Sequence, residues 1–196
     1  MENVLRGIPS VLVRVDDILV TGKTDAEHRS NVRLVLKRLG QAGLKVKLPK
    51  CKFFRPSVVY MGHQVDSVGI HPTADKVEAI HQAPAPANRA QLRCYLGLLN
   101  FYRKFIPSLS TIIEPLNQLL SERQRWTWTS QQQTAFDKSK ELLCSDTVLV
   151  HYDSDKPLVL SCDASPYGVG AVLAHYGPDG QVRPVAFASR TLNDTE

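Results

Sequence analysis

The chain has 196 residues, of which 43% are hydrophobic and 22% are charged. This balance is typical of a globular protein with one large or two small domains, and it excludes intrinsic disorder and a collagen-like chain. The apolar runs are far too short for a membrane span, and residues 1–10 lack the apolar segment of a signal peptide. The four cysteines lie far apart in the sequence. We therefore expect reduced, mostly buried thiols rather than a zinc site or a compact disulfide framework.

The net charge of +5 is distributed unevenly along the chain. Residues 1–106 contain 17 Lys and Arg against 8 Asp and Glu, whereas residues 107–196 contain 7 against 11. Between His28 and Val65 there are nine basic residues and no acidic residue. Such a stretch suits a polyanionic partner, although a solvated positive surface without a partner explains the composition equally well.

A β-hairpin is the first element that the sequence predicts. Two runs of β-branched and aliphatic residues, Val11–Val15 and Ile18–Val20, flank Asp16 and Asp17, which would then lie at the turn. Adjacent carboxylates at a tight turn can bind a hard divalent cation such as Mg²⁺ through their oxygens. Aspartate is also favoured at turns for local hydrogen-bonding reasons, so the pair alone leaves a purely structural role open.

An amphipathic helix is expected after the hairpin, because Thr24 and Glu27 match a capping box. Apolar residues then recur at helical spacing: Val32, Val35, Leu36 and Leu39. The helix would bury this stripe and turn three basic residues outward: Arg29, Arg33 and Lys37. Short extended pieces over residues 44–47 and 58–65 would form a small β appendage, and Lys45 and Lys47 lie in the first of them.

The middle of the chain has a helical pattern. Helices are expected over residues 74–81, 88–105, about 109–120 and 130–143, with Ser130 as the N-cap of the last. The second of these carries an apolar stripe from Leu92 to Tyr102, and we expect this stripe to be buried in the core. Basic residues interleaved with the stripe would be available for contacts to phosphate groups.

The pattern changes to period two near the end of the chain. Strands are expected over residues 158–162, 168–175 and 183–189, with Gly177–Gly180 as the hairpin turn between the second and third. Asp163 is placed at the end of the first strand, a position that suits an ordinary turn aspartate as well as a metal ligand. An apolar face of this sheet is expected to stay partly exposed at Val159, Val172 and Phe187.

Motifs along almost the whole chain resemble one protein family, and they occur in the same order. Val13-Arg-Val-Asp-Asp-Ile-Leu-Val20 resembles the polymerase motif of reverse transcriptases. The order is that of the Pol polyprotein of gypsy-type LTR retrotransposons, from the end of the palm through thumb and connection into the ribonuclease H domain. Further matches are Tyr60–His63, Gly69–Ile70, Lys76–Ile80, Leu92–Pro107, Pro115–Leu116, Trp128 with Phe136, Leu160–Ser165, Tyr167–Leu173 and Pro184–Arg190.

The resemblance implies an α+β fold, in which a palm hairpin and a helical thumb and connection precede the first three strands of a ribonuclease H-like α/β domain. The implied boundaries are 1–70 for the palm with its β appendage, 71–150 for the thumb and connection, and 151–196 for the ribonuclease H-like part. The resemblance also implies that Asp16 and Asp17 bind Mg²⁺ for polymerisation, and that Asp163 is the first metal-binding aspartate of the ribonuclease H site.

The implied partners are primer–template nucleic acid and an RNA–DNA hybrid, with no membrane. The residues expected to contact them are basic: Arg29, Arg33, Lys37, Lys45, Lys47, Arg93, Arg103 and Lys104. In two respects the chain departs from the family pattern. Arg14 replaces an aromatic residue, and the sequence given lacks the upstream palm carboxylate and the ribonuclease H carboxylate expected beyond Glu196.

These departures predict that both active sites are incomplete, so that the chain alone is inactive as an RNA-directed DNA polymerase and as a ribonuclease H. A non-catalytic nucleic-acid-binding or interaction module derived from such an element is the alternative. Part of an otherwise active enzyme is a third interpretation.

Overall fold

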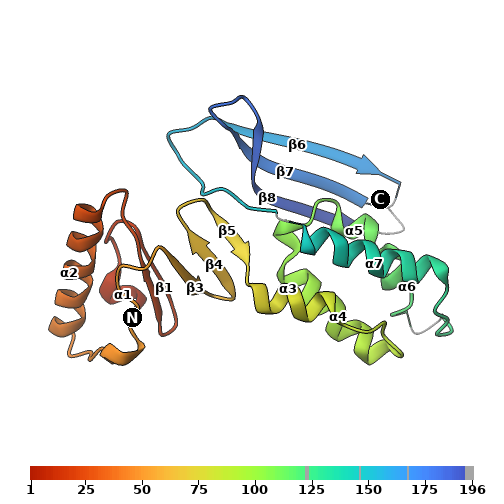
Figure 1. Ribbon diagram of the computed structural model, residues 1–196, viewed down its shortest axis with the longest axis horizontal. Helices are drawn as coiled ribbons and strands as arrows, with labels where there is room; N and C mark the ends of the chain where they lie inside the picture. Colours follow the sequence, from red (N-terminus) through yellow and green to blue (C-terminus); the bar gives the residue numbers. More distant parts are fainter. Residues whose placement is uncertain (122–123, 146, 167, 193–196) are drawn as a thin grey trace. The chain divides into compact units, whose positions relative to one another are not determined.

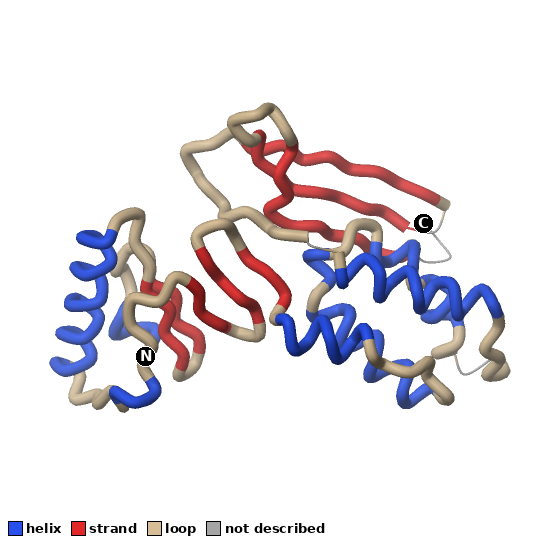
Figure 2. The backbone as a smooth tube through the Cα atoms, viewed as in Figure 1, coloured by secondary structure: helices blue, strands red, loops and turns tan. Residues whose placement is uncertain are grey.

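The computed structural model describes residues 1–121, 124–145, 147–166 and 168–192 (Figures 1 and 2). Tyr167 of the expected motif and the terminal Glu196 lie outside these ranges. The chain forms two compact units, Met1–Tyr60 (unit 1) and Met61–Glu196 (unit 2). Helices and antiparallel sheets are mixed along the chain, which confirms the predicted α+β class. A search of the described residues finds no helix with the length and apolar character needed to cross a membrane.

Unit 1 is built around the predicted hairpin. Strands β1 (Val11–Arg14) and β2 (Asp17–Val20) pair in antiparallel register. Helices α1 (Glu2–Leu5) and α2 (Asp25–Gln41) supply the buried residues Leu5, Val35 and Leu39, and the apolar hairpin side chains pack against them. The remaining elements are the short 3₁₀ helix η1 (Leu48–Lys50) and strand β3 (Ser57–Tyr60).

Helix α2 begins as predicted but buries a narrower stripe than its apolar residues suggested. The Thr24 hydroxyl accepts a hydrogen bond from the Glu27 amide. The Glu27 carboxylate accepts one from the backbone amide of Lys23, and not from that of Thr24 as a capping box requires. Leu36 is exposed, and the buried position one turn before Val35 is taken by Asn31, whose side-chain amide donates to the carbonyl of Thr21 at 3.0 Å. Because this polar residue is satisfied locally, it can be buried where hydrophobicity alone would exclude it.

The prediction of an extended segment over residues 44–47 is wrong. Leu44 donates its amide back to Leu39, which ends α2 in a compact turn with Gly43 at φ +74°. The residues that follow are exposed and do not form a strand. A strand needs a partner for its backbone groups, and local sequence cannot reveal whether one is present.

Unit 2 begins with a hairpin of β4 (His63–Asp66) and β5 (Ile70–Pro72), followed by a helical group. Its helices are α3 (Ala74–His81), α4 (Arg89–Phe101), η2 (Arg103–Phe105), α5 (Leu109–Ile112), α6 (Glu114–Gln118) and α7 (Ser130–Cys144). The predicted stripe on α4 is confirmed, since Leu92, Tyr95, Leu96, Leu99 and Tyr102 are all buried. They form one core with Phe105, Leu116 and Phe136.

Two details of the helical group differ from the prediction. The helix expected over residues 109–120 is split at Ile113, because Pro115 lacks an amide hydrogen and its ring would crowd the carbonyl of Thr111 in a continuous helix. The N-cap of α7 is Thr129 rather than Ser130, and it forms a capping box with Gln132.

The last element of unit 2 is a three-stranded antiparallel sheet of β6 (Leu158–Ser165), β7 (Gly168–Tyr176) and β8 (Val182–Thr191), in that order. The predicted turn is confirmed by a hydrogen bond of 2.7 Å from the amide of Gly177 to the carbonyl of Gln181. Phe187 packs against the helical core but is only partly buried, as are Val159 and Val172, which confirms the predicted partial exposure.

The prediction of mostly buried cysteines is wrong. All four thiols are free, but Cys94 and Cys162 are exposed, and Cys51 and Cys144 are partly buried. Cys94 is exposed between the buried positions Leu92 and Tyr95 of α4, so its helical position rather than its hydrophobicity decides its burial.

Candidate catalytic carboxylates and basic surface

The hairpin turn of unit 1 places two carboxylates side by side in sequence. Arg14 and Asp17 are paired across the strands, which leaves Val15 and Asp16 as the two turn residues. Val15 has φ +53°, as the first turn residue of a type II′ turn requires. A β-branched residue rarely adopts this conformation, so the backbone is strained next to Asp16.

The two faces of the hairpin differ in chemistry. Val13 and Ile18 are paired with each other and pack against the helices of unit 1. Because side chains alternate along a strand, Arg14 and Asp17 lie on the opposite face. Asp16 and Asp17 are both exposed, and neither forms an ion pair with any residue that the structure describes. The turn therefore presents two carboxylates that no basic side chain within the described ranges neutralises by direct pairing.

Tyr60 of β3 lies within the electrostatic influence of this turn. Burial, and to a lesser degree the charge of Asp17, raise the pKa of the Tyr60 hydroxyl above its usual value, while Arg14 opposes the shift. The sequence placed Tyr60 in a family motif but did not indicate that it lies near Asp17. Only the fold brings these two residues together.

Replacing Asp17 by asparagine is expected to lower the pKa of Tyr60, because the negative charge that disfavours the phenolate is removed. An NMR titration of the protein labelled with ¹³C-tyrosine measures this shift. Asp25→Asn is the matched control, since Asp25 is an exposed aspartate of unit 1 that does not influence Tyr60. An unchanged Tyr60 titration in the folded Asp17→Asn protein would contradict the geometry.

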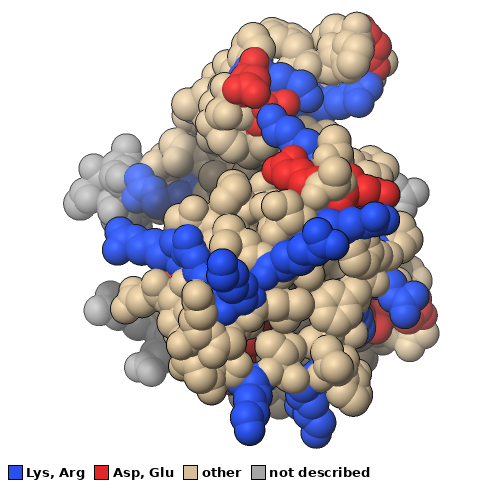
Figure 3. Space-filling view, turned by 90° about the vertical axis from the view of Figure 1, so that its left-hand side faces the viewer, with Lys and Arg blue, Asp and Glu red and all other residues tan. Residues whose placement is uncertain are grey.

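The predicted basic residues of unit 1 lie on its surface. Arg29, Arg33 and Lys37 are spaced four residues apart on α2 and are all exposed, so they form a stripe along one face of the helix. None of them takes part in an ion pair with another described residue. Seen from the side of Figure 1 on which α2 lies, Lys and Arg side chains form a band (Figure 3). Lys45 and Lys47 are exposed in the loop after α2.

The predicted basic residues of unit 2 have different environments. Arg93 and Arg103 are exposed, whereas Lys104 is partly buried with its ammonium 5.3 Å from the ring centre of Phe105. Burial lowers the pKa of Lys104. The pKa of His63 is also lowered, chiefly by its burial and secondly by the charge of Lys104. Lys104 is thus less accessible to a ligand than the two arginines.

Asp163 lies within β6, two residues before the strand ends, close to its predicted position at the end of the first strand. It is exposed and paired with Gly170, and its Oδ1 accepts a hydrogen bond of 2.9 Å from the amide of Ala164. With Arg103 and Ser189 it lines an open pocket of about 500 Å³. Among the described residues there is no group of three or more His, Cys, Asp or Glu side chains that could hold a metal ion.

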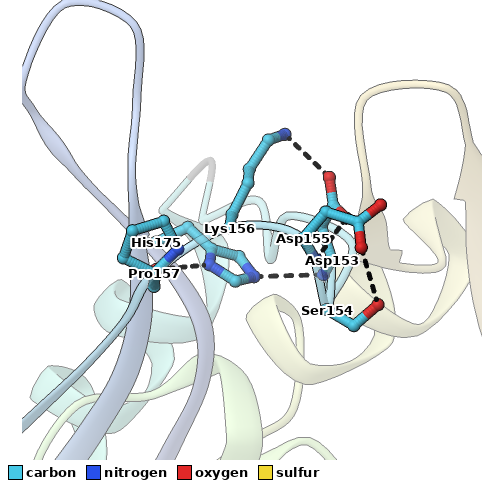
Figure 4. A network of polar contacts seen from close by, with 6 residues as sticks. All are labelled: Asp153, Ser154, Asp155, Lys156, Pro157 and His175. Atoms are coloured by element: carbon cyan, nitrogen blue, oxygen red, sulfur yellow. Dashed lines mark hydrogen bonds and ion pairs between the residues drawn. The ribbon is translucent and has the colours of Figure 1, made fainter.

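The segment 147–157, which we call the strap, connects the sheet that carries Asp163 to the β4–β5 hairpin. Leu149 exchanges two backbone hydrogen bonds with Ile70, of 2.8 and 3.1 Å. Farther along the strap, His175 of β7 donates from Nδ1 to the carbonyl of Pro157 and accepts at Nε2 from the amide of Asp153, at 2.9 and 3.1 Å (Figure 4). The strap therefore holds the sheet to the β4–β5 hairpin.

Two family models match the chain. The model described as "Reverse transcriptase (RNA-dependent DNA polymerase)" matches residues 1–65, and that of the "RNase H-like domain found in reverse transcriptase" matches residues 128–196. The Transposon Tf2-3 and Tf2-7 polyproteins of Schizosaccharomyces pombe are 37% and 36% identical over 186 residues. These alignments cover 95% of this chain but only 14% of each polyprotein, so the chain spans a small part of its relatives.

Solved structures of foamy viral protease-reverse transcriptase are also similar. One, of the form named dRH in complex with double-stranded DNA, has a TM-score of 0.85 and 31% identity, and the match covers 100% of this chain and 34% of that one. Another, in complex with an RNA/DNA hybrid, has a TM-score of 0.82 and 32% identity, with 100% and 26% of the two chains covered. The family that the motifs predicted is confirmed by these similarities.

Proposed function

We propose that this chain, which belongs to the Pol polyproteins of gypsy-type LTR retrotransposons, supplies part of each active site for RNA-directed DNA polymerisation and for RNA cleavage in a hybrid. The observation that carries this assignment is the strained turn, which presents Asp16 and Asp17 without an ion-pair partner in the described part of the chain. Residues 1–70 would be the end of the palm, 71–150 the thumb and connection, and 151–196 the beginning of the ribonuclease H-like domain.

The exposed carboxylates fit a divalent metal. Mg²⁺ takes oxygen ligands, and Asp16 and Asp17 offer several within one turn, while Asp163 offers two more in the sheet. When bound, the metal stabilises charge on the transferring phosphate and activates the attacking oxygen. The role of the chain is to fix the direction of these carboxylates, by the hairpin turn in one case and by strand pairing in the other.

Neither carboxylate set is sufficient alone. Two-metal chemistry needs several carboxylates around the ions, and no group of three metal-binding side chains occurs among the residues described. We therefore expect the isolated 196-residue chain to bind nucleic acid but to lack polymerase and ribonuclease activity. The incomplete carboxylate sets also favour a second candidate function, that of a non-catalytic nucleic-acid-binding module derived from such an element.

Binding to nucleic acid is supported by the foamy viral structures, which are complexes with double-stranded DNA and with an RNA/DNA hybrid. In this chain the contacts would come from exposed arginines and lysines without acidic neighbours in sequence. Those of unit 1 are Arg29, Arg33, Lys37, Lys45 and Lys47, and those of unit 2 are Arg93 and Arg103, with the partly buried Lys104 beside them.

Fluorescence anisotropy with a labelled RNA–DNA hybrid, together with a primer-extension assay, tests this function. Affinity is expected to fall by about 10³-fold or more between ~50 and ~200 mM salt if six or more phosphates are contacted. No extension of a primer in Mg²⁺ is expected. Binding that is independent of salt, or absent at low salt in a folded sample, would refute the binding role. Extension that Asp16→Asn abolishes would refute the inactivity of the chain alone.

A further inference from the structure

The loop between α2 and β3, residues 42–56, is long and almost entirely exposed. Apart from the single turn of η1 it has no regular structure, and Cys51 is its one partly buried residue. It contains five basic residues and no acidic residue: Lys45, Lys47, Lys50, Lys52 and Arg55. Loops of this length in compact proteins are usually either functional or linker segments.

Two adjacent aromatic rings stand out on this loop. Phe53 is 42% and Phe54 is 51% exposed. The ring of Phe54 is held by two side chains of α2: its centre lies 5.7 Å from the guanidinium carbon of Arg29 and 4.9 Å from the ring centre of His28. Phe54 also has φ +50°, a conformation that non-glycine residues adopt infrequently. Its ring is thus fixed in direction although half of its surface faces solvent.

We propose that Phe53 and Phe54 form a base-stacking site for single-stranded nucleic acid, with the surrounding lysines and arginines binding its phosphates. Proteins that bind single strands without sequence preference combine these same two elements, aromatic rings for the bases and a basic surface for the backbone. The site favours unpaired bases, because the bases of a duplex are already stacked on one another. The inference rests on the proposed function and specifies which form of nucleic acid this surface takes.

Charge complementarity selects the occupant. A hydrophobic protein partner would explain the exposed rings but not the five basic residues among and beside them. An acidic peptide would explain the charges but gains less from an aromatic platform than a nucleobase does. Single-stranded nucleic acid satisfies both features at once.

The test uses an oligothymidylate with one 2-aminopurine, whose fluorescence is quenched when its base stacks on a ring. The full chain is expected to quench this signal on binding. The double variant Phe53→Leu with Phe54→Leu is expected to lose the quenching and to bind the single strand about tenfold or more weakly, with binding of a blunt duplex unchanged. Phe54→Tyr keeps an aromatic ring, so this variant should retain both the quenching and the affinity for the single strand.

Leu48→Ala is the matched control, because Leu48 is an apolar residue of the same loop that is 67% exposed but has no ring. It should change neither affinity nor quenching. Salt-dependent binding by the wild type that the leucine substitutions leave unchanged would overturn the stacking site while leaving the proposed function intact. Absence of any salt-dependent binding by the folded wild type would overturn both. A polyglutamate peptide that binds as tightly as the oligonucleotide would show that the surface responds to charge alone.

Discussion

Replacing Arg29, Arg33 and Lys37 together by glutamine is expected to weaken the binding of an RNA–DNA hybrid by about 100-fold or more at ~0.1 M salt. These residues form an exposed stripe on α2 and have no ion-pair partner among the described residues. Each contact to a phosphate releases a counterion. Losing three contacts should therefore also reduce the steepness of the plot of log K against log[salt] by about two to three. Anisotropy titrations at several salt concentrations measure both effects.

A control triple variant removes the same amount of charge from other places. Lys138, Lys156 and Arg183 each form an ion pair with an acidic side chain three or four residues away. Replacing these three by glutamine should leave the affinity almost unchanged, because their charges are already partly compensated. An equal loss of affinity in both triple variants would show that binding follows net charge, and that the stripe on α2 has no special part in it.

Gly69→Ala is expected to destabilise unit 2 by about 2–4 kcal/mol. A Cβ atom at this position would overlap the carbonyl oxygen of Leu149 and crowd Val148. The backbone would have to move, at the expense of the two hydrogen bonds between Ile70 and Leu149 that attach the strap. The free energy of unfolding, measured by urea denaturation, reports the loss.

Gly97→Ala, in the same unit, is expected to change the free energy of unfolding in the opposite direction. Gly97 lies inside α4 and a Cβ there would contact nothing within 4 Å, so alanine should stabilise the helix by about 1 kcal/mol through its better helix propensity. A Gly69→Ala protein as stable as the wild type would mean that the strap and the β4–β5 hairpin are not held together as described.

Sequence periodicity predicted the elements whose burial is decided locally. The β1–β2 hairpin, α3 and the buried stripe of α4 are where alternation or helical spacing placed them, because one face of each packs on a core. The split at Pro115 could also have been read from the sequence, since proline is poorly tolerated beyond the first turn of a helix. By contrast, the strap depends on pairing between Ile70 and Leu149, and no local pattern reports a contact between residues so far apart.

The sequence could predict which residues belong to the candidate site, but not how they are arranged in space. Asp16, Asp17 and Asp163 were found because they occur in family motifs, and a turn aspartate in any other protein would have looked the same. The positive φ of Val15 and the influence of Asp17 on Tyr60 arise from tertiary structure. For Phe54 a signal existed in the sequence, an aromatic pair within an acid-free basic stretch, but its contacts with His28 and Arg29 required the fold.

The role of Asp16 and Asp17 is tested most directly in a complete polymerase. Residues 1–196 would replace the similar segment in the reverse transcriptase of the Schizosaccharomyces pombe relative, and primer extension on an RNA template would be measured in Mg²⁺. Extension is expected, if necessary after Arg14→Tyr, and it should be lost with Asp16→Asn or Asp17→Asn but kept with Asp25→Asn. Extension that persists at the same rate without either carboxylate of the hairpin turn would contradict the assignment.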